Sequence, residues 1–373
     1  MQTDILIIGQ GICGTFLSRE LERAGLSFMV IDEERPATAS RAAAGLINPV
    51  TGRRMVKTWM IDELLPVVRE SYEPDFIRPV SVVDFFPTPQ MRLAFLKRYE
   101  EDPQYLRLPA DEHHWDAFFH YELGYGCIES CYLVDMQRLL GAARKRMVER
   151  GLLRAERFVV EELVVGKPVA GELTAGEWVD GRYGGRYRDI EARWVVFCDG
   201  IESSQNAYFS RLPFAPNKGE LLIIEAPDLA GGGNWGSVED GALASVVFKK
   251  GMSIIPWKEG LYWVGSSYEW SFEDPGPTKA FRERTEAFLK YWLRVPFRTV
   301  EHLASVRPAT LERRPFVGLH PLYPAVGILN GMGTKGCSLA PYFARQLVGL
   351  LASGVPVRAD ADIGRFRKVL GSG

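Results

Sequence analysis

Short apolar runs and one amphipathic segment open the chain and predict its first three elements. Residues 4–8 form a short, mostly apolar run that is typical of a buried parallel strand. The spacing of apolar residues from about Ile12 onward predicts a helix, and Gly25 is placed to end it. Residues 28–31 predict a second strand, which ends at Asp32. A strand, a helix and a strand in this order are typical of a doubly wound parallel sheet.

The middle of the chain has a less regular pattern. Residues 76–130 mix aromatic and charged side chains without a clear period, so no element is assigned there. Asp135 is then placed to cap a helix that Gly151 ends. Strands are expected over residues 158–165 and 194–197, with a glycine-rich meander between them.

Four short β-rich runs separated by glycine and proline predict an antiparallel sheet over residues 216–300. A helix is expected after Thr278, and the final part predicts a strand over residues 326–329, a glycine-rich turn and a helix over about 338–352. The pattern therefore indicates a nucleotide-binding sheet built from separated pieces and interrupted by an antiparallel substrate domain. The four runs are residues 221–224, 245–248, 252–255 and 261–264.

Composition narrows the class of protein. The 373 residues correspond to two or three domains, with the hydrophobic (46%) and charged (25%) fractions of a soluble globular protein. A net charge of -2 argues against a nucleic-acid partner, which usually demands a basic excess. No uncharged apolar run reaches the roughly 18 residues of a membrane span, and the N-terminus has no signal-peptide pattern, so a cytoplasmic location is expected. Five scattered cysteines without metal-ligand spacing predict reduced thiols and no metal site.

Residues 9–14 carry the first chemical motif. They fit G-x-G-x-x-G between the first predicted strand and helix. In this motif the first glycine makes the tight turn, the second lets backbone approach a pyrophosphate, and the third lets the helix pack on the strand. The helix N-terminus then faces the phosphates, and Asp32 stands where a carboxylate binds ribose hydroxyls. We interpret the segment as a dinucleotide site.

Three further segments favour FAD over NAD. Residues 40–45 are rich in small side chains, which suits a chain that runs close along a cofactor. Residues 195–200 form a strand that ends in a glycine turn, and this turn can return the chain to the cofactor cleft. Residues 331–336 precede the last helix, whose positive end, together with a lysine, can stabilise negative charge on the flavin pyrimidine.

Together these segments resemble the D-amino-acid oxidase superfamily of flavoproteins, which includes glycine and sarcosine oxidases. The resemblance also covers residues 198–200, 218–220 and 305–318, in the order of the family and over nearly the whole chain. It implies an α/β fold with a Rossmann-type FAD-binding domain and a discontinuous α+β substrate domain built on an antiparallel sheet. The implied boundaries are 1–75 with 132–215 and 301–373 for the FAD-binding domain, and 76–131 with 216–300 for the substrate domain.

The resemblance implies oxidation of a C–N bond in a small amine or amino acid by hydride transfer to flavin N5, after which water hydrolyses the imine. Oxygen or another acceptor would re-oxidise the flavin. The family's substrate-carboxylate arginine corresponds to Arg307, because this residue precedes proline in the matching segment. A planar guanidinium can bind a carboxylate through two hydrogen bonds and so orient the substrate. Lys335 is the second catalytic candidate, either activating oxygen or binding an anionic substrate.

The resemblance has limits and leaves other residues open. Residues 311–315 depart from the family's Asp-Gly-x-Pro pattern, which puts the local loop in doubt. The cysteine position of covalent flavin attachment is not matched, and Cys337 lies outside that pattern, so non-covalent FAD is expected. The predicted cofactor-binding residues are Gly9, Gly11, Ile12, Gly14, Asp32, Ser40, Arg41, Ala44, Gly45, Val159, Asp199, Gly200, Gly331, Gly333, Thr334, Lys335 and Gly336.

Some side chains have two readings. Arg53 and Arg54 either line the substrate entrance or lie in a solvated loop. Tyr262 and Trp263 alternate on a strand, so one of them faces the flavin side and the other faces away, and core packing is the simpler role for both. The histidines show no ligand spacing and receive no role.

Three other functions remain open from the sequence. Residues 330–336 also resemble the oxidase half of the tRNA wobble-uridine modification enzyme, a reading that a continuous basic face around the cleft would support. A flavin-binding sensor without a substrate-carboxylate anchor is the second alternative. An NAD dehydrogenase is the third, although it leaves the terminal glycine-rich turn without a role.

Overall fold

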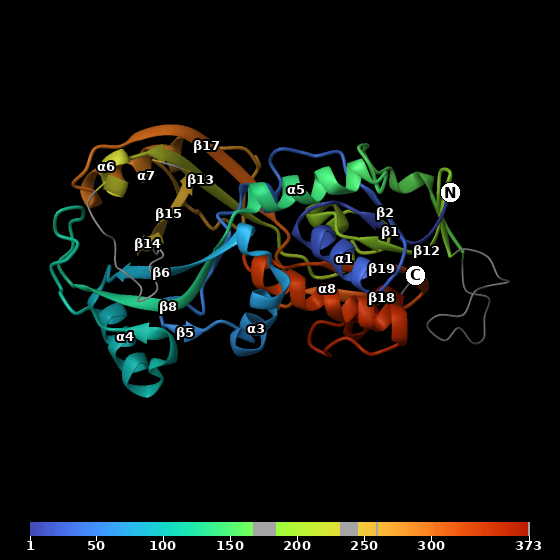
Figure 1. Cartoon of the computed structure of the whole chain (residues 1–373), viewed down its shortest axis with the longest axis horizontal. Coiled ribbons are helices and arrows are strands. Elements are labelled where there is room, and N and C mark those ends of the chain that lie inside the picture. Colours follow the sequence, from blue (N-terminus) through green and yellow to red (C-terminus); the bar gives the residue numbers. More distant parts are fainter. Residues whose placement is uncertain (167–183, 232–244, 259, 372–373) are drawn as a thin grey trace.

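Two β-sheets side by side form the frame of this computed structural model (Figure 1). The structure describes residues 1–166, 184–231, 245–258 and 260–371. The predicted glycine-rich meander after residue 165 falls mostly outside these ranges. The fold is mixed α/β, as expected, and both chain ends lie at the first sheet, on the right of Figure 1.

The first sheet has eight strands and a parallel centre, as predicted. Its central strand pairs parallel with two neighbours, and each neighbour pairs parallel with one strand further out. The side chains of these central strands are almost all buried, which explains their near-continuous apolar sequences. In spatial order the parallel strands are β9 (Leu153–Arg154), β2 (Phe28–Ile31), β1 (Gln2–Ile8), β12 (Ile190–Phe197) and β19 (Tyr323–Asn330).

Three antiparallel strands complete this sheet. They are β10 (Leu163–Val165), β11 (Gly185–Tyr187) and β18 (Phe316–His320). The strand predicted over 158–165 is therefore too long, because a 3-10 turn at Val160–Glu162 interrupts it. Val159 lies before that turn and lines the large cavity described below.

Three helices cover one face of the first sheet. α1 (Ile12–Arg23) lies between α5 (Met136–Glu149) and α8 (Gly336–Ser353), and all three share one buried apolar cluster with this face (Figure 1). Asp135 caps α5 by accepting a hydrogen bond from Arg138 N, as predicted. Since alternate strand residues point to opposite faces, the other face packs against a second cluster that includes Phe209 and Leu212.

The second sheet has nine strands and is mixed rather than antiparallel. Its four predicted runs lie in β13 to β16, but β14 pairs parallel with β6 because two segments far apart in the chain meet there. Both β6 and β8 fall in the region where the sequence predicted no element. In spatial order the strands are β17 (Arg298–Arg307), β13 (Asn217–Glu225), β16 (Leu261–Gly265), β15 (Met252–Lys258), β14 (Ser245–Lys250), β6 (Ile77–Phe85), β8 (Tyr125–Val134) and β3 (Leu46–Ile47), with β7 (Leu106–Arg107) also on β8.

A buried polar cluster fixes α7 (Lys279–Trp292) to the second sheet. The helix begins after Thr278, as predicted. Thr278 also caps it, and its backbone N–H and hydroxyl both donate to the Glu220 carboxylate, at 2.6 and 2.8 Å. Lys218 Nζ lies 3.3 Å and His302 Nε2 3.0 Å from the same fully buried carboxylate. Hydrogen bonds and a cation therefore compensate its burial.

The remaining helices lie around these layers. α3 packs against α8, whereas α4 lies on the side of the second sheet (Figure 1). No helix within the described residues has the length and apolarity of a membrane span. These helices are α2 (Ala39–Ala42), α3 (Ile61–Ser71), α4 (Pro89–Glu101), α6 (Pro227–Gly231) and α9 (Arg367–Gly371).

Strand pairing crosses the predicted domain boundaries in three places. β3 and the end of β8 lie in the second sheet although their residues were expected in the FAD-binding domain. Most of β17 does so too, because it pairs with β13 over its whole length. The crossing strands bring residues of both sheets to one cavity.

Candidate functional site

A cavity of about 1270 Å³ lies between the two sheets. This volume exceeds the roughly 300–1,000 Å³ of drug-sized ligand pockets and suits a dinucleotide. Most of the predicted cofactor-binding residues line it; the exceptions are Gly14, Gly331 and Lys335. Those on its wall are Gly9, Gly11, Ile12, Asp32, Ser40, Arg41, Ala44, Gly45, Val159, Asp199, Gly200, Gly333, Thr334 and Gly336.

The turn between β1 and α1 has the geometry that the glycine motif predicts. Gly14 is not on the cavity wall, because it forms the contact between helix and strand: a Cβ there would lie 2.0 Å from Gly9 O. Gly9 has a φ of +97°, a conformation that glycine adopts without strain. Ile12 N donates to Ser40 Oγ at 3.0 Å, so the small-residue segment is fixed at the start of the helix. The N-terminal end of α1 therefore opens onto the cavity.

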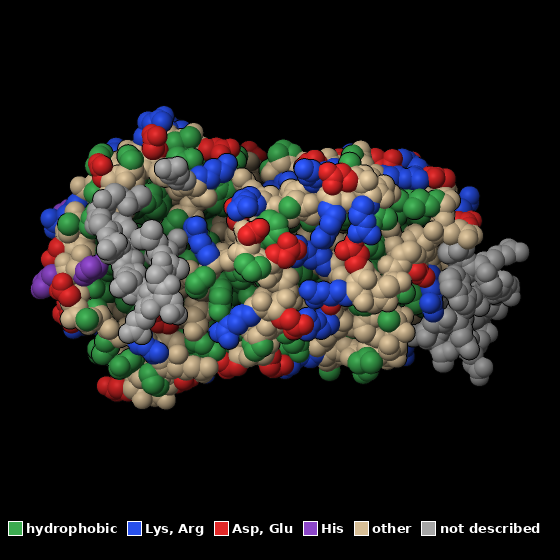
Figure 2. Space-filling view, viewed as in Figure 1, with side chains coloured by type: hydrophobic (Ala, Val, Ile, Leu, Met, Phe, Trp, Pro, Cys, Tyr) green, Lys and Arg blue, Asp and Glu red, His purple; other side chains and the backbone are tan. Residues whose placement is uncertain are grey.

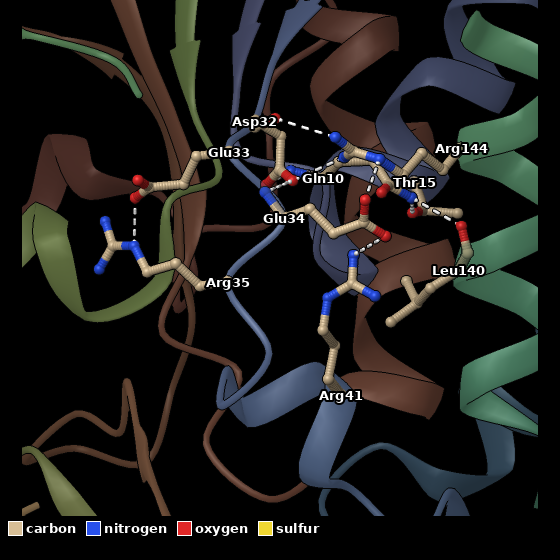
Figure 3. A network of polar contacts seen from close by, with 9 residues as sticks. All are labelled: Gln10, Thr15, Asp32, Glu33, Glu34, Arg35, Arg41, Leu140 and Arg144. Carbon is tan, nitrogen blue, oxygen red and sulfur yellow. Dashed lines mark hydrogen bonds and ion pairs between the residues drawn. The ribbon is translucent and has the colours of Figure 1, made fainter. Parts of the chain in front are cut away.

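The Asp32 carboxylate is the centre of a polar network at the ends of β1 and β2 (Figure 3). It accepts hydrogen bonds from Gln10 N at 2.9 Å and Glu34 N at 2.8 Å. Arg144 from α5 also binds it, with Nη1 2.8 Å from Oδ1, while Arg144 Nε lies 2.8 Å from Glu34 Oε2. Arg41 lies 3.4 Å from the other Glu34 oxygen. Two arginines thus offset the acidic charge where the sequence predicts a ribose site.

Asn330, the last residue of β19, holds the turn that follows β12. Its Nδ2 donates to Gly200 O at 2.8 Å and to Ser203 Oγ at 3.1 Å, and the Ser203 hydroxyl donates to Asp199. Burial raises the pKa of Asp199 to about 7, and the Ser203 hydrogen bond offsets only part of this effect. Gly331 N donates to Asn330 Oδ1 at 2.8 Å, so Gly331 helps to fix the turn after β19 although it does not line the large cavity.

Arg307 ends β17 and lines the cavity from the side of the second sheet. Its Nη1 donates to Asn217 Oδ1 and its Nη2 to Ser266 Oγ, each at 2.6 Å, and both nitrogens reach Ser267 O at 3.3 and 3.4 Å. The guanidinium lies against Gly219, where a Cβ would be 1.8 Å from Nη2. Among the described residues no carboxylate oxygen lies within 4.0 Å of it, so its recorded hydrogen-bond partners are neutral.

Other candidates divide between the cavity and the surface. Trp263 lines the cavity and donates from Nε1 to Ala42 O at 3.0 Å, whereas Tyr262 lies in the outer apolar cluster of the second sheet. The predicted alternation of the two aromatic residues is confirmed. Arg53 and Arg54 are exposed and lie on the wall of neither the large cavity nor the smaller one described next.

Lys335 faces a smaller cavity of about 210 Å³ next to the large one. Its Nζ lies 3.3 Å from Thr58 Oγ1. Burial, with a smaller contribution from Lys249, lowers the pKa of Lys335 to about 8. Thr334 and Cys337 line both cavities, so the glycine-rich turn lies where the two cavities adjoin.

The family model described as "FAD dependent oxidoreductase" (DAO) matches residues 4–350. The chain belongs to this family. This protein therefore binds FAD and is an oxidoreductase, and the predicted family, fold class and cofactor are confirmed.

Known relatives align with this chain over almost its whole length. The chain is 24% identical over 381 residues to glycine oxidase from Pseudomonas aeruginosa, and this alignment covers 96% of this chain and 97% of the relative. The crystal structure of iminodiacetate oxidase from Chelativorans sp. BNC1 matches with a TM-score of 0.68 at 20% identity, over 97% of this chain and 98% of that one. Glycine oxidase from Geobacillus kaustophilus matches with a TM-score of 0.66 at 16% identity, over 98% of both chains.

The large cavity fits FAD in both size and polarity. The β1–α1 turn offers a helix N-terminus to the diphosphate, and the Asp32 network lies where the ribose is expected. Trp263 and Arg307 lie on the walls that the second sheet contributes. We expect the predicted residues on the wall to hold the cofactor without a covalent bond.

Several residues that shape the site were missed from the sequence. Arg144, Asn217 and Lys249 lie in a helix and in two strands whose local sequence gives no sign of a ligand. Gly219 lies in a segment that carries the family resemblance, but its closeness to Arg307 depends on the pairing of β13 with β17. Their roles arise from pairing between distant segments.

Surface charge bears on the alternative of an RNA substrate. On the face shown in Figure 2, lysine and arginine side chains are interspersed with aspartate and glutamate. A continuous basic surface, which phosphate-backbone binding favours, is not seen on this face. The net charge of -2 agrees with this distribution.

Proposed function

We propose that this protein oxidises the C–N bond of a small amino acid or carboxylate-bearing amine. The observation that carries this proposal is Arg307, a partly buried cation on the cavity wall with neutral hydrogen-bond partners. Burying a charge without a counter-charge is costly, and a substrate carboxylate would supply the counter-charge. Arg307 is the expected anchor for that group.

In this proposal the protein binds and orients while the cofactor receives the electrons. Bound FAD supplies the hydride acceptor of the reaction. Asn217 and Ser266 hold the Arg307 guanidinium in one orientation, so a bound carboxylate would present its Cα–H in a fixed direction. A deprotonated amine can lose hydride without a strong base, and water then hydrolyses the resulting imine.

The relatives support this substrate class. Glycine oxidase from P. aeruginosa and iminodiacetate oxidase from Chelativorans sp. carry the names of small amino-acid substrates with carboxylates. These relatives are 24% and 20% identical to this chain, and the class that their names share is a small amine that carries a carboxylate.

The test is an anaerobic titration of the FAD-loaded protein followed by its absorbance spectrum. Glycine, sarcosine, iminodiacetate, D-amino acids and L-proline are added in turn, and we expect at least one of them to bleach the flavin band. Return of the colour in air with release of peroxide would identify an oxidase. If every compound leaves the band unchanged, the proposed reaction is wrong.

Arg307→Ala separates an enzyme with a carboxylate anchor from a flavin-binding sensor. Loss of a charged hydrogen-bond partner costs about 1.5–3 kcal/mol. The second-order rate constant for flavin bleaching by the substrate should therefore fall roughly 10- to 100-fold. Arg294→Ala is the control, because its Nε donates only to Phe119 O, at 3.3 Å, in the outer cluster. An equal loss in both variants would contradict an anchor role.

A further inference from the structure

The smaller cavity is built from segments of both sheets. Its volume is about 210 Å³, enough for a carboxylate and a few methylene groups but far too small for a dinucleotide. Leu46, Ser253, Thr334 and Cys337 line both this cavity and the large one, so the two are contiguous. The smaller cavity therefore adjoins the part of the large one that Ser253 of the second sheet lines.

Two lysines face this smaller cavity. Lys335 comes from the N-terminal end of α8 and Lys249 from β14. They lie close enough for the charge on Lys249 to affect the proton affinity of Lys335. The positive end of α8, an 18-residue helix, adds to the same potential. Neutral polar side chains complete the wall, namely Asn48, Thr51, Thr58, Ser253 and Ser338.

The carboxylates beside these two lysines supply less negative charge than the lysines carry positive charge. Asp84, fully buried behind the wall, binds Lys249 with Oδ2 at 2.6 Å. Lys335 has the Thr58 hydroxyl as its hydrogen-bond partner, and in the described part of the chain no carboxylate lies within 4.0 Å of its Nζ. One positive charge on the wall of this cavity therefore has no counter-charge, which favours the binding of an anion there.

We propose that the smaller cavity is a subsite for a second carboxylate of the substrate, so that the substrate class is an amino acid or secondary amine with two carboxylates. This inference rests on the proposed function, in which Arg307 binds the first carboxylate. Lys335 would bind the second directly, and Lys249, already paired with Asp84, would contribute through its charge. A neutral ligand would leave the excess positive charge unbalanced.

The subsite can be tested by binding, without turnover. Isothermal titration calorimetry of the FAD-loaded protein would compare butyrate with glutarate, which differ by one carboxylate, and then dicarboxylates from malonate to adipate. A charged hydrogen bond predicts about tenfold tighter binding of the best dicarboxylate than of its monocarboxylate match. Lys335→Met should abolish this preference and Lys335→Arg should retain it.

Lys250→Met is the matched control, because Lys250 follows Lys249 on the same strand and points to the other face, where its Nζ donates to His120 O at 3.0 Å. It should leave the preference unchanged. Equal binding of mono- and dicarboxylates, a preference that survives Lys335→Met, or a loss of FAD rather than of preference in Lys335→Met would each overturn the subsite. A dicarboxylate preference in a protein whose flavin no amine bleaches would support the subsite and refute the proposed reaction.

Discussion

Arg307 and Lys335 combine two physical properties: each lies on a cavity wall, and each has neutral hydrogen-bond partners. Other basic residues near the cofactor cavity, such as Arg144 beside Asp32, form ion pairs with carboxylates of the chain. At the scale of single residues, the function is therefore marked by charge that the chain itself leaves uncompensated.

Gly219→Ala should disable Arg307 without touching its charge. The new methyl group would lie 1.8 Å from Nη2, so the guanidinium must leave its bonds to Asn217 and Ser266. We expect substrate-dependent flavin bleaching to slow by about tenfold or more, as for loss of one charged contact. Gly141→Ala in α5 is the control, since a Cβ there meets no atom within 4 Å. Unchanged bleaching in Gly219→Ala would show that this contact does not position Arg307.

Asp199 should make FAD affinity depend on pH. Burial raises the pKa of this cavity-wall carboxyl to about 7, so it gains negative charge as the pH rises through that value. The diphosphate of FAD is anionic, hence binding favours the protonated form and should weaken several-fold between about pH 6 and 8. Fluorescence titration of FAD measures this. Asp199→Asn removes the titrating group, so the FAD affinity of this variant should not change with pH. If the variant shows the same pH dependence as the wild type, a group other than Asp199 causes it.

Lys335 should make dicarboxylate affinity depend on pH in the alkaline range. Its pKa is lowered to about 8 by burial and Lys249, while Asp84, which pairs with Lys249, is the other charged group nearby. Only protonated Lys335 attracts an anion, so glutarate affinity should be constant below about pH 7 and fall above pH 8. Calorimetry at both ends checks this. Lys335→Arg, whose side chain stays charged, should abolish the fall; a wild-type affinity independent of pH would contradict the assignment.

At the scale of elements, the site depends on where helices and strands end. α5 contributes Arg144 to the Asp32 network although the helix is more than a hundred residues from β2 in sequence. The turn after β19 is ordered by Asn330, which contacts the turn after β12. The carboxyl ends of parallel strands thus meet at one edge of the sheet, as open α/β sheets require for ligand binding.

Arg144→Met should weaken FAD binding. It removes the cation that contacts both Asp32 and Glu34, so their negative charges are less compensated where the ribose of the anionic cofactor is expected. We expect an FAD dissociation constant about tenfold higher, in line with a lost charged hydrogen bond. Arg146→Met, on the same helix and 3.9 Å from Glu22 at the surface, is the control. An effect of Arg144→Met on thermal stability but not on FAD affinity would assign it a structural role.

The parts of the fold that local pattern determines could be predicted from the sequence. The first strand, helix and strand, the Asp135 cap, the helix after Thr278 and the runs inside β13 to β16 were all found, because each has its own periodicity or capping residue. β6 and β8 were missed, since Pro79 and mixed polar residues hide their alternation. The parallel pairing of β14 with β6 and the partners of Arg307 depend on contacts between distant segments, which no local pattern encodes.

At the scale of the whole molecule, FAD should act as a bridge between the sheets. The large cavity has walls from both of them, so full occupation stabilises their association as well as each wall. A ligand at 100 times its dissociation constant adds about 2.7 kcal/mol to the free energy of unfolding. At equal saturation relative to the dissociation constant, FAD and ADP should stabilise equally if unfolding is a single transition.

Thermal unfolding followed by calorimetry, with either FAD or ADP bound, would test this bridging. ADP can fill only the nucleotide part of the cavity, next to the first sheet. If the two sheets unfold in separate transitions, ADP should raise the temperature of the first sheet's transition alone. If FAD merges two calorimetric transitions into one while ADP leaves them separate, the bridge is supported. Two separate transitions in the presence of saturating FAD would contradict it.

The late position of β19 has a consequence for how the protein is made. β19 occupies residues 323–330 and pairs with β12, and the turn and helix that follow complete the nucleotide cavity. During translation the ribosome delivers these residues long after β1, β2 and β12. Until then the carboxyl half of β12 lacks its neighbour, an open strand edge that invites aggregation. Cofactor capture therefore has to wait until β19 and the start of α8 have been made, and chaperones would have most to protect in the interval between the synthesis of β12 and that of β19.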